Sequence, residues 1–181
     1  MHYQRQNKSI STVFPRTVGG GLNQPPPTPT IIMEDFIVRV YLDNCCFNRP
    51  YDEQAMLKIR LETQAKLDIQ KLISDGKIEL IWSFVLSYEN AMNPFVEKRI
   101  RIAEWRKIAA VDCGLTDEIS KKSAELMKLG LSVKDSFHVA CAIFANADYF
   151  ITTDKGIINK GISELEVINP VDFVLLTEGN I

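Results

Sequence analysis

From Phe36 onward, short apolar runs alternate with longer stretches of helical periodicity, and few folds accommodate such an alternation. The first run, residues 36–42, is apolar apart from Arg39 and ends at Asp43, which is typical of a strand buried on both faces. The other predicted strands cover residues 78–85, 148–153 and 165–168. Strands separated by helices predict the α/β class, with a mostly parallel sheet covered by helices on both faces.

Helices are predicted between these strands from their apolar stripes and their capping residues. Asp52 is the expected N-cap of the first helix, and Ser87 is the expected N-cap of the second. The first helix should end at Gly76 and carries an apolar stripe of Leu57, Leu61, Ala65, Ile69 and Leu72. Further helices are expected to begin near Thr116 and near Ser132. The last of these is apolar nearly all round as far as Phe144, so it should be buried.

Composition places the chain among ordinary soluble proteins of one domain. Its 181 residues are 46% hydrophobic and 24% charged, and a core of this size forms without disulfides. The four cysteines include no C-x-x-C pair and are expected to be small buried side chains in a reducing compartment. No apolar run approaches ~18 residues, and the first residues lack the apolar core of a secretory signal. We therefore expect a cytoplasmic protein without a membrane span.

The formal charge of −2 arises from 21 basic and 23 acidic side chains. This balance lacks the basic surplus of a typical nucleic-acid-binding domain, although a local basic rim beside an acidic site is compatible with it. One helix is predicted to carry such a rim, formed by Lys98, Arg99, Arg101, Arg106 and Lys107. The basic rim is equally compatible with contact to a phosphate backbone and with a solvated face of an amphipathic helix.

Residues 1–34 differ in composition from the rest of the chain. They contain three glycines at 19–21 and a proline-rich stretch that begins at Pro25, with little periodic hydrophobicity. Such a segment buries too little apolar surface to offset its ordering entropy. We therefore predict a disordered extension over 1–34 and a single domain over 35–181, with Met33 as an alternative start.

Four acidic residues are predicted to meet at one edge of the sheet. Asp43 and Asp154 directly follow predicted strands, while Glu89 and Asp135 lie in the opening turns of helices. The carboxyl ends of the strands are where open parallel sheets bind their ligands. Each acid alone is explained more simply, as a turn former, a helix cap or a partner of a helix dipole. Four such coincidences at one edge are less expected than a shared site.

Four crowded carboxylates repel one another, and a bound divalent cation removes this cost. Oxygen ligands favour Mg²⁺ or Mn²⁺. Such an ion lowers the pKa of a bound water and screens the charge of a phosphodiester. The acids therefore indicate metal-dependent hydrolysis of a phosphodiester.

Three segments of the chain resemble motifs of PIN-domain proteins. The first, third and fourth motifs are matched by residues 43–50 (DNCCFNRP), 134–140 (KDSFHVA) and 147–154 (ADYFITTD). Residues 83–89 (SFVLSYE) fit the second motif loosely, with Asn90 in place of the usual apolar neighbour. The resemblance runs from about Phe36 to the end of the chain. It implies a PIN-like three-layer α/β/α sandwich with a central mostly parallel sheet.

The resemblance also implies a function. Proteins of this family cleave RNA with Mg²⁺ or Mn²⁺, and many are toxins of VapC-type toxin–antitoxin pairs, often dimeric. By resemblance, the metal-binding acids are Asp43, Glu89, Asp135 and Asp154. Thr152 matches the usual Ser/Thr helper, and Asn44 is a candidate for orienting Asp43. The expected partners are an RNA substrate, an antitoxin protein and a second copy of the chain.

Three further side chains have two interpretations each. His138 lies one turn after Asp135 on an otherwise apolar helix. A position in the core or behind the metal ligands is favoured over a general base, because metal hydroxide makes a separate base unnecessary. Trp82 and Trp105 lie in apolar patterns and are expected in the core rather than stacked on bases.

Other functions compete with an endoribonuclease. An aspartyl-phosphate enzyme usually needs a second aspartate two residues after the first, where this chain has Cys45. A DNA-directed or structure-specific nuclease uses the same acids, so this alternative stays open. A catalytically silent PIN-fold module that only binds a partner also stays open, although acids at all four positions argue against it.

Overall fold

The computed structural model describes residues 37–177, so the predicted disordered extension over 1–34 lies outside the described residues. Within them, five strands form one sheet in the order β3-β2-β1-β4-β5, and each neighbouring pair is parallel. The strands are β1 (Val38–Leu42), β2 (Ile78–Ser83), β3 (Val111–Cys113), β4 (Tyr149–Ile151) and β5 (Glu166–Ile168). The sheet confirms the predicted α/β class.

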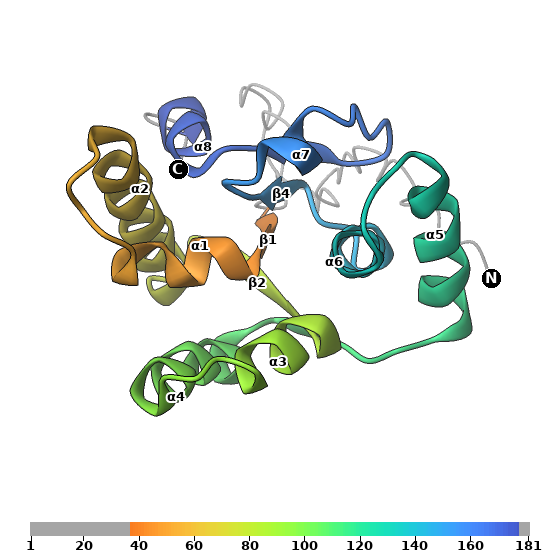
Figure 1. The fold of residues 1–181 in the computed structure, drawn as a ribbon, viewed down its shortest axis with the longest axis horizontal. Helices are drawn as coiled ribbons and strands as arrows, with labels where there is room; N and C mark the ends of the chain where they lie inside the picture. Colours follow the sequence, from red (N-terminus) through yellow and green to blue (C-terminus); the bar gives the residue numbers. More distant parts are fainter. Residues whose placement is uncertain (1–36, 178–181) are drawn as a thin grey trace, which may run out of the picture. The chain divides into compact units, whose positions relative to one another are not determined.

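Helices cover both faces of this sheet, as predicted (Figure 1). The α-helices are α1 (Asn44–Asn48), α2 (Leu57–Ser74), α3 (Phe84–Ala91), α4 (Val96–Ala103), α5 (Asp117–Lys128), α6 (Val133–Phe144), α7 (Lys155–Ile158) and α8 (Pro170–Thr177). Two 3₁₀ turns, η1 (Arg49–Tyr51) and η2 (Glu104–Ile108), follow α1 and α4. Helices α2 and α8 pack together on one side of the sheet, and α5 and α6 pack together on the other. The arrangement is a three-layer α/β/α sandwich.

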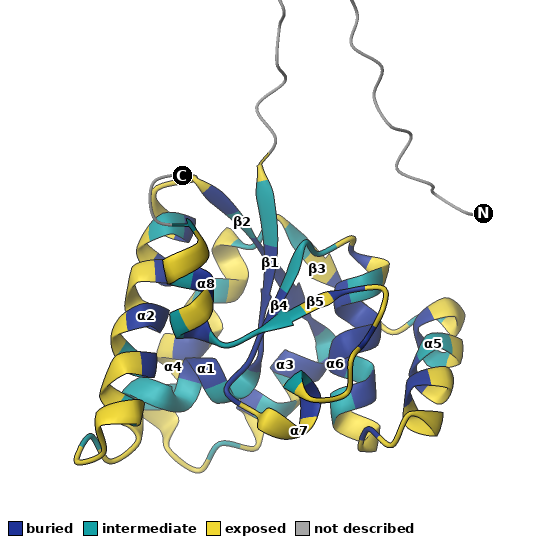
Figure 2. Cartoon of the chain, turned by 90° about the horizontal axis from the view of Figure 1, so that it is seen from above, coloured by how far each residue is buried: buried dark blue, intermediate teal, exposed yellow. Residues whose placement is uncertain are grey.

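The central strand β1 forms the middle of the core. Val40, Tyr41 and Leu42 are fully buried, and Figure 2 shows the buried surface continuing along β1, β2 and α6. Arg39 is the one charged residue of this strand. It stands opposite Glu79 of β2, and the Arg39 guanidinium lies 2.8 Å from the Glu79 carboxylate. This ion pair explains how the strand accommodates a charge.

The first predicted helix begins later than expected, and the prediction that Asp52 caps it is wrong. Helix α2 begins at Leu57, whereas the carboxylate of Asp52 lies 2.8 Å from the guanidinium of Arg49. The buried face of α2 is also rotated from the predicted stripe, because Leu57 and Leu61 are exposed while Glu62 is buried. Glu62 is accommodated by Arg49, 3.1 Å away, and a stripe of apolar residues cannot reveal such a buried polar partner.

Strand β2 ends two residues earlier than the predicted strand over residues 78–85. Strand β2 ends at Ser83, and Ser83 rather than Ser87 is the N-cap, since its hydroxyl accepts the N–H of Leu86. The hydroxyl of Ser87 instead accepts the indole N–H of Trp82 at 2.8 Å. Glu89 therefore lies in the second turn of α3 and not in its opening turn.

The basic stretch over residues 98–107 is not one helix, because α4 ends at Ala103 and η2 follows it. The edge strand β3 is not among the predicted strands, because its three residues are too few for an apolar pattern. In contrast, α5 and α6 begin near Thr116 and Ser132 as predicted, and the structure shows these two residues to be the N-caps. Helix α6 is largely buried, also as predicted.

The cysteines and tryptophans behave largely as expected. Cys46, Cys113 and Cys141 are buried, whereas Cys45 is half-buried. Trp82 is fully buried, and the partly buried Trp105 packs against the core. In the described part of the chain, none of the helices combines the length and the apolarity that crossing a membrane requires.

Candidate metal centre

Asp43 lies where β1 meets α1, and its carboxylate is held from both sides. Oδ1 accepts the backbone N–H of Asn44 at 2.7 Å, so Asn44 orients Asp43 through its backbone. Oδ2 accepts the hydroxyl of Thr152 at 2.7 Å and the thiol of Cys45 at 3.1 Å. Asp43 is 7% exposed, and no lysine or arginine among residues 37–177 forms an ion pair with it. A buried carboxylate without a cation is unfavourable, so this position is suited to a bound metal ion.

Thr152 connects two of the predicted acids. This fully buried residue follows β4, and its backbone N–H donates to the carbonyl of Ile168 at 3.0 Å. Its hydroxyl donates to Asp43 and accepts the backbone N–H of Asp154 at 3.0 Å. Thr152 is thus fixed by the sheet and is placed to orient Asp43.

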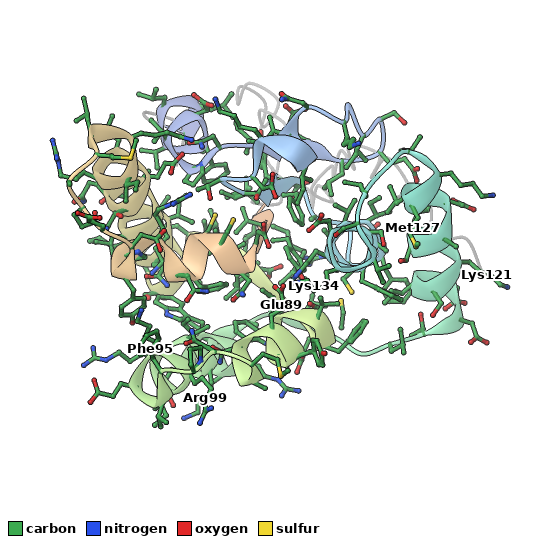
Figure 3. All side chains as sticks on the ribbon, in the orientation of Figure 1. Glu89, Phe95, Arg99, Lys121, Met127 and Lys134 are labelled. Atoms are coloured by element: carbon green, nitrogen blue, oxygen red, sulfur yellow. The ribbon has the colours of Figure 1, made fainter. Side chains whose placement is uncertain are left out.

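Glu89 reaches the site from α3 and is held by two residues of α6. Its Oε2 lies 2.9 Å from Nε2 of His138, and its Oε1 accepts the Lys134 ammonium at 2.8 Å. Figure 3 shows Glu89 and Lys134 next to each other at the centre of the view. Burial alone would raise the pKa of Glu89, but the hydrogen bonds from His138 and Lys134 outweigh it and lower the pKa to about 2. Glu89 is therefore an ionised, negatively charged group at neutral pH.

A buried series of hydrogen bonds holds His138 at its Nδ1 atom, the ring nitrogen that does not contact Glu89. Its Nδ1 lies 2.7 Å from the Tyr41 hydroxyl, which in turn lies 2.7 Å from the hydroxyl of Ser83. Because the ionised Glu89 only accepts, Nε2 of His138 carries a proton in this contact, and in a neutral imidazole Tyr41 donates to Nδ1. Burial raises the pKa of Tyr41 well above its usual value, so the phenol stays neutral. If both hydroxyls reverse their direction, Tyr41 accepts a hydrogen bond from Nδ1–H of His138. The imidazole tautomer with its proton on Nδ1 would leave Nε2 free to bind a cation.

Ligand atoms of Asp43, Glu89 and His138 all lie within 4.8 Å of one another. Within residues 37–177, these three side chains form the group of acids and imidazoles that is close enough to hold one metal ion. The two carboxylates suit Mg²⁺ or Mn²⁺, and the imidazole widens the choice to later transition-metal ions. The donor set therefore fits a divalent cation.

The structure does not bring the other two predicted acids into this group. Asp135 is half-buried in the first turn of α6, where it accepts the hydroxyl of the capping serine at 2.6 Å. Asp154 is exposed and caps α7 by accepting a backbone N–H at 2.6 Å. Both nevertheless flank the group, because Asp135 lies one turn before His138 and Asp154 is joined to Thr152.

Two residues of this site were not singled out from the sequence. Tyr41 is part of an apolar run, yet its position two residues before Asp43 signals a buried hydroxyl that needs a partner. Lys134 directly precedes Asp135 in the first turn of a helix, where a positive charge is unfavourable to the helix dipole. A cation in such a position indicates a contact outside its own helix.

The lowered pKa of Glu89 predicts how the stability of the protein depends on pH. Glu89 gives up its proton more readily in the folded state, with a pKa of about 2, than in the unfolded chain, where ~4.3 is usual. Its contribution is therefore complete above pH ~4.5 and is lost as the pH falls towards 2. In chelator, wild type should melt higher than Glu89→Gln at pH 5, and the gap should close by pH 2.

Thermal denaturation across this pH range measures the effect. Glu97→Gln, the same change at an exposed position of α4, is the control. Its melting temperature should depend on pH as that of wild type does. A constant gap between wild type and Glu89→Gln would contradict the ionic contacts of Glu89 described above.

Comparisons with known proteins identify the fold. No protein-family model matches the chain, and no curated protein matches it. A chain of a toxin–antitoxin complex from Klebsiella pneumoniae superposes with a TM-score of 0.52 and 13% identity, over 72% of this chain and 97% of that one. A chain of VapBC2 from Rickettsia felis, bound to a DNA fragment from its promoter, has a TM-score of 0.46 and 14% identity, over 73% and 98%. The first likeness extends over nearly the whole of the solved chain, and the present chain has a PIN-like α/β/α fold.

Proposed function

We propose that this chain is a metal-dependent endoribonuclease that hydrolyses RNA phosphodiester bonds. The observation that carries the proposal is the meeting of Asp43, Glu89 and His138 beside the carboxyl ends of parallel strands, in a PIN-like fold. This is the edge at which open α/β sheets bind their ligands. Asp43 is buried beside the ionised Glu89 without a lysine or arginine partner of its own among residues 37–177, and a divalent cation would stabilise this arrangement and assist hydrolysis of a phosphodiester.

The proposed metal-binding acids are Asp43, Glu89, Asp135 and Asp154, and His138 is the additional candidate ligand. When bound, Mg²⁺ or Mn²⁺ supplies Lewis-acid polarisation of the phosphodiester and hydroxide near neutral pH. The residues behind the acids fix their directions. Thr152 holds one oxygen of Asp43, while His138 holds one oxygen of Glu89. Such preorganisation keeps the ligands in place without reorganisation during the reaction.

The proposed biological setting is that of a toxin. The Klebsiella pneumoniae structure is a toxin–antitoxin complex, and this likeness in fold supports an antitoxin protein as a partner here. We further propose RNA as the substrate, on the strength of the motifs over residues 43–50, 134–140 and 147–154. A second copy of the chain is the other proposed partner, and the cytoplasm is the proposed location. A small reading frame directly upstream of the gene would support the antitoxin.

The proposal predicts cleavage of labelled single-stranded RNA by the purified protein in millimolar Mn²⁺ or Mg²⁺, and none in chelator. Single- and double-stranded DNA of the same sequence are the matched substrates. Faster cleavage of DNA would favour the alternative of a DNA-directed or structure-specific nuclease. No cleavage of any substrate, with the protein correctly folded, would favour a silent partner-binding module.

A further inference from the structure

A hollow of about 370 Å³ lies between the end of α1, the side of α2 and the α4–η2 segment. Its size falls in the range of small-ligand sites, roughly 300–1,000 Å³. Lys66 and Gln70 line it from α2, and Arg101 and Trp105 line it from α4 and η2. Figure 1 shows α1 between α2 and α4. None of these four residues belongs to the metal centre.

Two of the lining side chains are buried without a partner. Lys66 and Gln70 are 5% and 6% exposed and lie one turn apart on α2. Nε2 of Gln70 has no hydrogen-bond partner, and Lys66 forms no ion pair or hydrogen bond with any of residues 37–177. Burial lowers the pKa of Lys66 to about 8, so the amine is still largely protonated at neutral pH. A buried donor without an acceptor, as at Nε2 of Gln70, is unfavourable, and a ligand rich in acceptors would complete the hollow.

The rest of the lining adds positive charge and an aromatic surface. Arg101 is exposed and has no ion-pair partner in the described part of the chain. Glu104 also lines the hollow, but its carboxylate is held by the Lys107 ammonium at 2.6 Å. Trp105 is half-buried, so part of its indole borders solvent. The hollow therefore offers three unpartnered donors and one large ring.

We propose that this hollow binds a nucleotide, with the phosphate on Lys66, Gln70 and Arg101 and the base against Trp105. Charged donors match the acceptor oxygens of a phosphate, and an aromatic ring offers a face on which any base can stack. The nucleotide is either a unit of an RNA chain or a free mononucleotide. The RNA source rests on the proposed function.

The position of α1 connects the hollow to the metal centre. Asp43 caps the first turn of this helix, while Phe47 in its last turn lines the hollow. The helix is five residues long, which corresponds to about 7.5 Å. The hollow and the candidate metal centre thus adjoin opposite ends of the same short helix.

Tryptophan fluorescence tests the proposal directly. The chain has two tryptophans, and Trp82 is 1% exposed, so a ligand in the hollow should change the emission of Trp105 alone. The ligands are inorganic phosphate, uridine, uridine monophosphate and a short single-stranded oligoribonucleotide, all in chelator to prevent cleavage. We expect saturable quenching by the mononucleotide or the oligonucleotide, tighter than by phosphate or uridine, and no such signal from Trp105→Phe.

Matched variants assign the signal to the hollow. Lys66→Met should weaken binding about tenfold, the loss expected for one charge-assisted hydrogen bond. Lys121→Met is the control, because Lys121 is exposed on α5, at the opposite edge of Figure 3 from α2. Lys66→Met should melt no lower than wild type, since it removes a buried ammonium without a partner. Should it fail to fold, Arg101→Met at the exposed side of the hollow provides the same test.

Each outcome has a defined meaning. Binding of the oligonucleotide alone supports a unit of RNA as the ligand, and equal binding of the mononucleotide supports a free nucleotide. Unchanged affinity in both Lys66→Met and Arg101→Met, or no saturable quenching at all, would overturn the proposal. An acidic peptide that binds where nucleotides do not would overturn it as well, in favour of a protein partner. All binding is measured in chelator, where no cleavage takes place, so a failure of the nuclease proposal remains distinguishable from a failure of this one.

Discussion

Asp43→Asn should lower the rate of Mn²⁺-dependent RNA cleavage by about a hundredfold or more, because loss of even a group behind a metal ligand costs roughly 10–100-fold. The far-ultraviolet circular dichroism spectrum should not change, since asparagine caps a helix as well as aspartate does. Asp43 is the most buried of the four predicted acids and lies between the N–H of Asn44 and the hydroxyl of Thr152. Single-turnover cleavage of labelled RNA measures the effect.

Several variants calibrate this result. Asp68→Asn makes the same chemical change on the exposed surface of α2 and should cleave like wild type. Thr152→Val should lose roughly 10–100-fold, because Thr152 orients Asp43 and is joined to Asp154 without being a proposed ligand itself. Asp135→Asn should also abolish cleavage if Asp135 is a ligand, and Asp154→Asn tests the fourth acid in the same way. Undiminished cleavage by Asp43→Asn would refute the assignment of the site.

Asp43→Asn should melt at a higher temperature than wild type in chelator and at a lower temperature than wild type in Mn²⁺. Without a cation, the buried carboxylate of Asp43 has no lysine or arginine partner within residues 37–177 and lies close to the ionised Glu89. Neutralising Asp43 removes the repulsion between the two carboxylates. A gain of about 1 kcal/mol in the free energy of unfolding corresponds to a rise of roughly 2–4 °C in Tm for a domain of this size. Functional sites often retain such destabilising arrangements.

Bound metal should reverse the order of the two melting temperatures, because wild type gains stability from the metal and Asp43→Asn gains far less. At 100 times the Kd, the gain is about 2.7 kcal/mol. The measurement is thermal denaturation at neutral pH, with chelator and with millimolar Mn²⁺, and Asp68→Asn serves again as the control. Equal metal-induced shifts in wild type and Asp43→Asn would show that Asp43 is no ligand. A mutant less stable in chelator would instead identify Asp43 as a turn former.

The parts of the fold that could be predicted are those that depend on neighbours in the chain. The apolar run before Asp43, and the Thr116 and Ser132 caps, are local signals, and the structure confirms them. The cap at Asp52 failed because Arg49, three residues before it, offers the carboxylate an ion pair instead. Propensity is a weak guide wherever such a contact is available.

The contacts that complete the site could not be predicted in the same way. Glu89 and Lys134 are 45 residues apart, and Tyr41 and His138 are 97 residues apart. No local pattern carries information about such pairs, because parallel strands and crossover helices bring them together only in the finished fold. The motif resemblance predicts Asp43 and Glu89 as metal ligands, and the structure places both beside His138, whose hydrogen bonds no motif indicates.

The ion pair between Lys134 and Glu89 has a consequence for the proposed binding of a metal ion, because a cation at Glu89 would have to replace the Lys134 ammonium. Lys134 is a long, largely exposed side chain whose ammonium now neutralises the carboxylate that a divalent cation would claim. An arriving cation therefore displaces a charge that the protein already supplies, and the released ammonium stays at the mouth of the site. There it can attract a polyanion, so the affinities for the cation and for a phosphate chain become linked. By reciprocity, a nucleic acid that engages Lys134 should tighten the binding of the cation to the same degree.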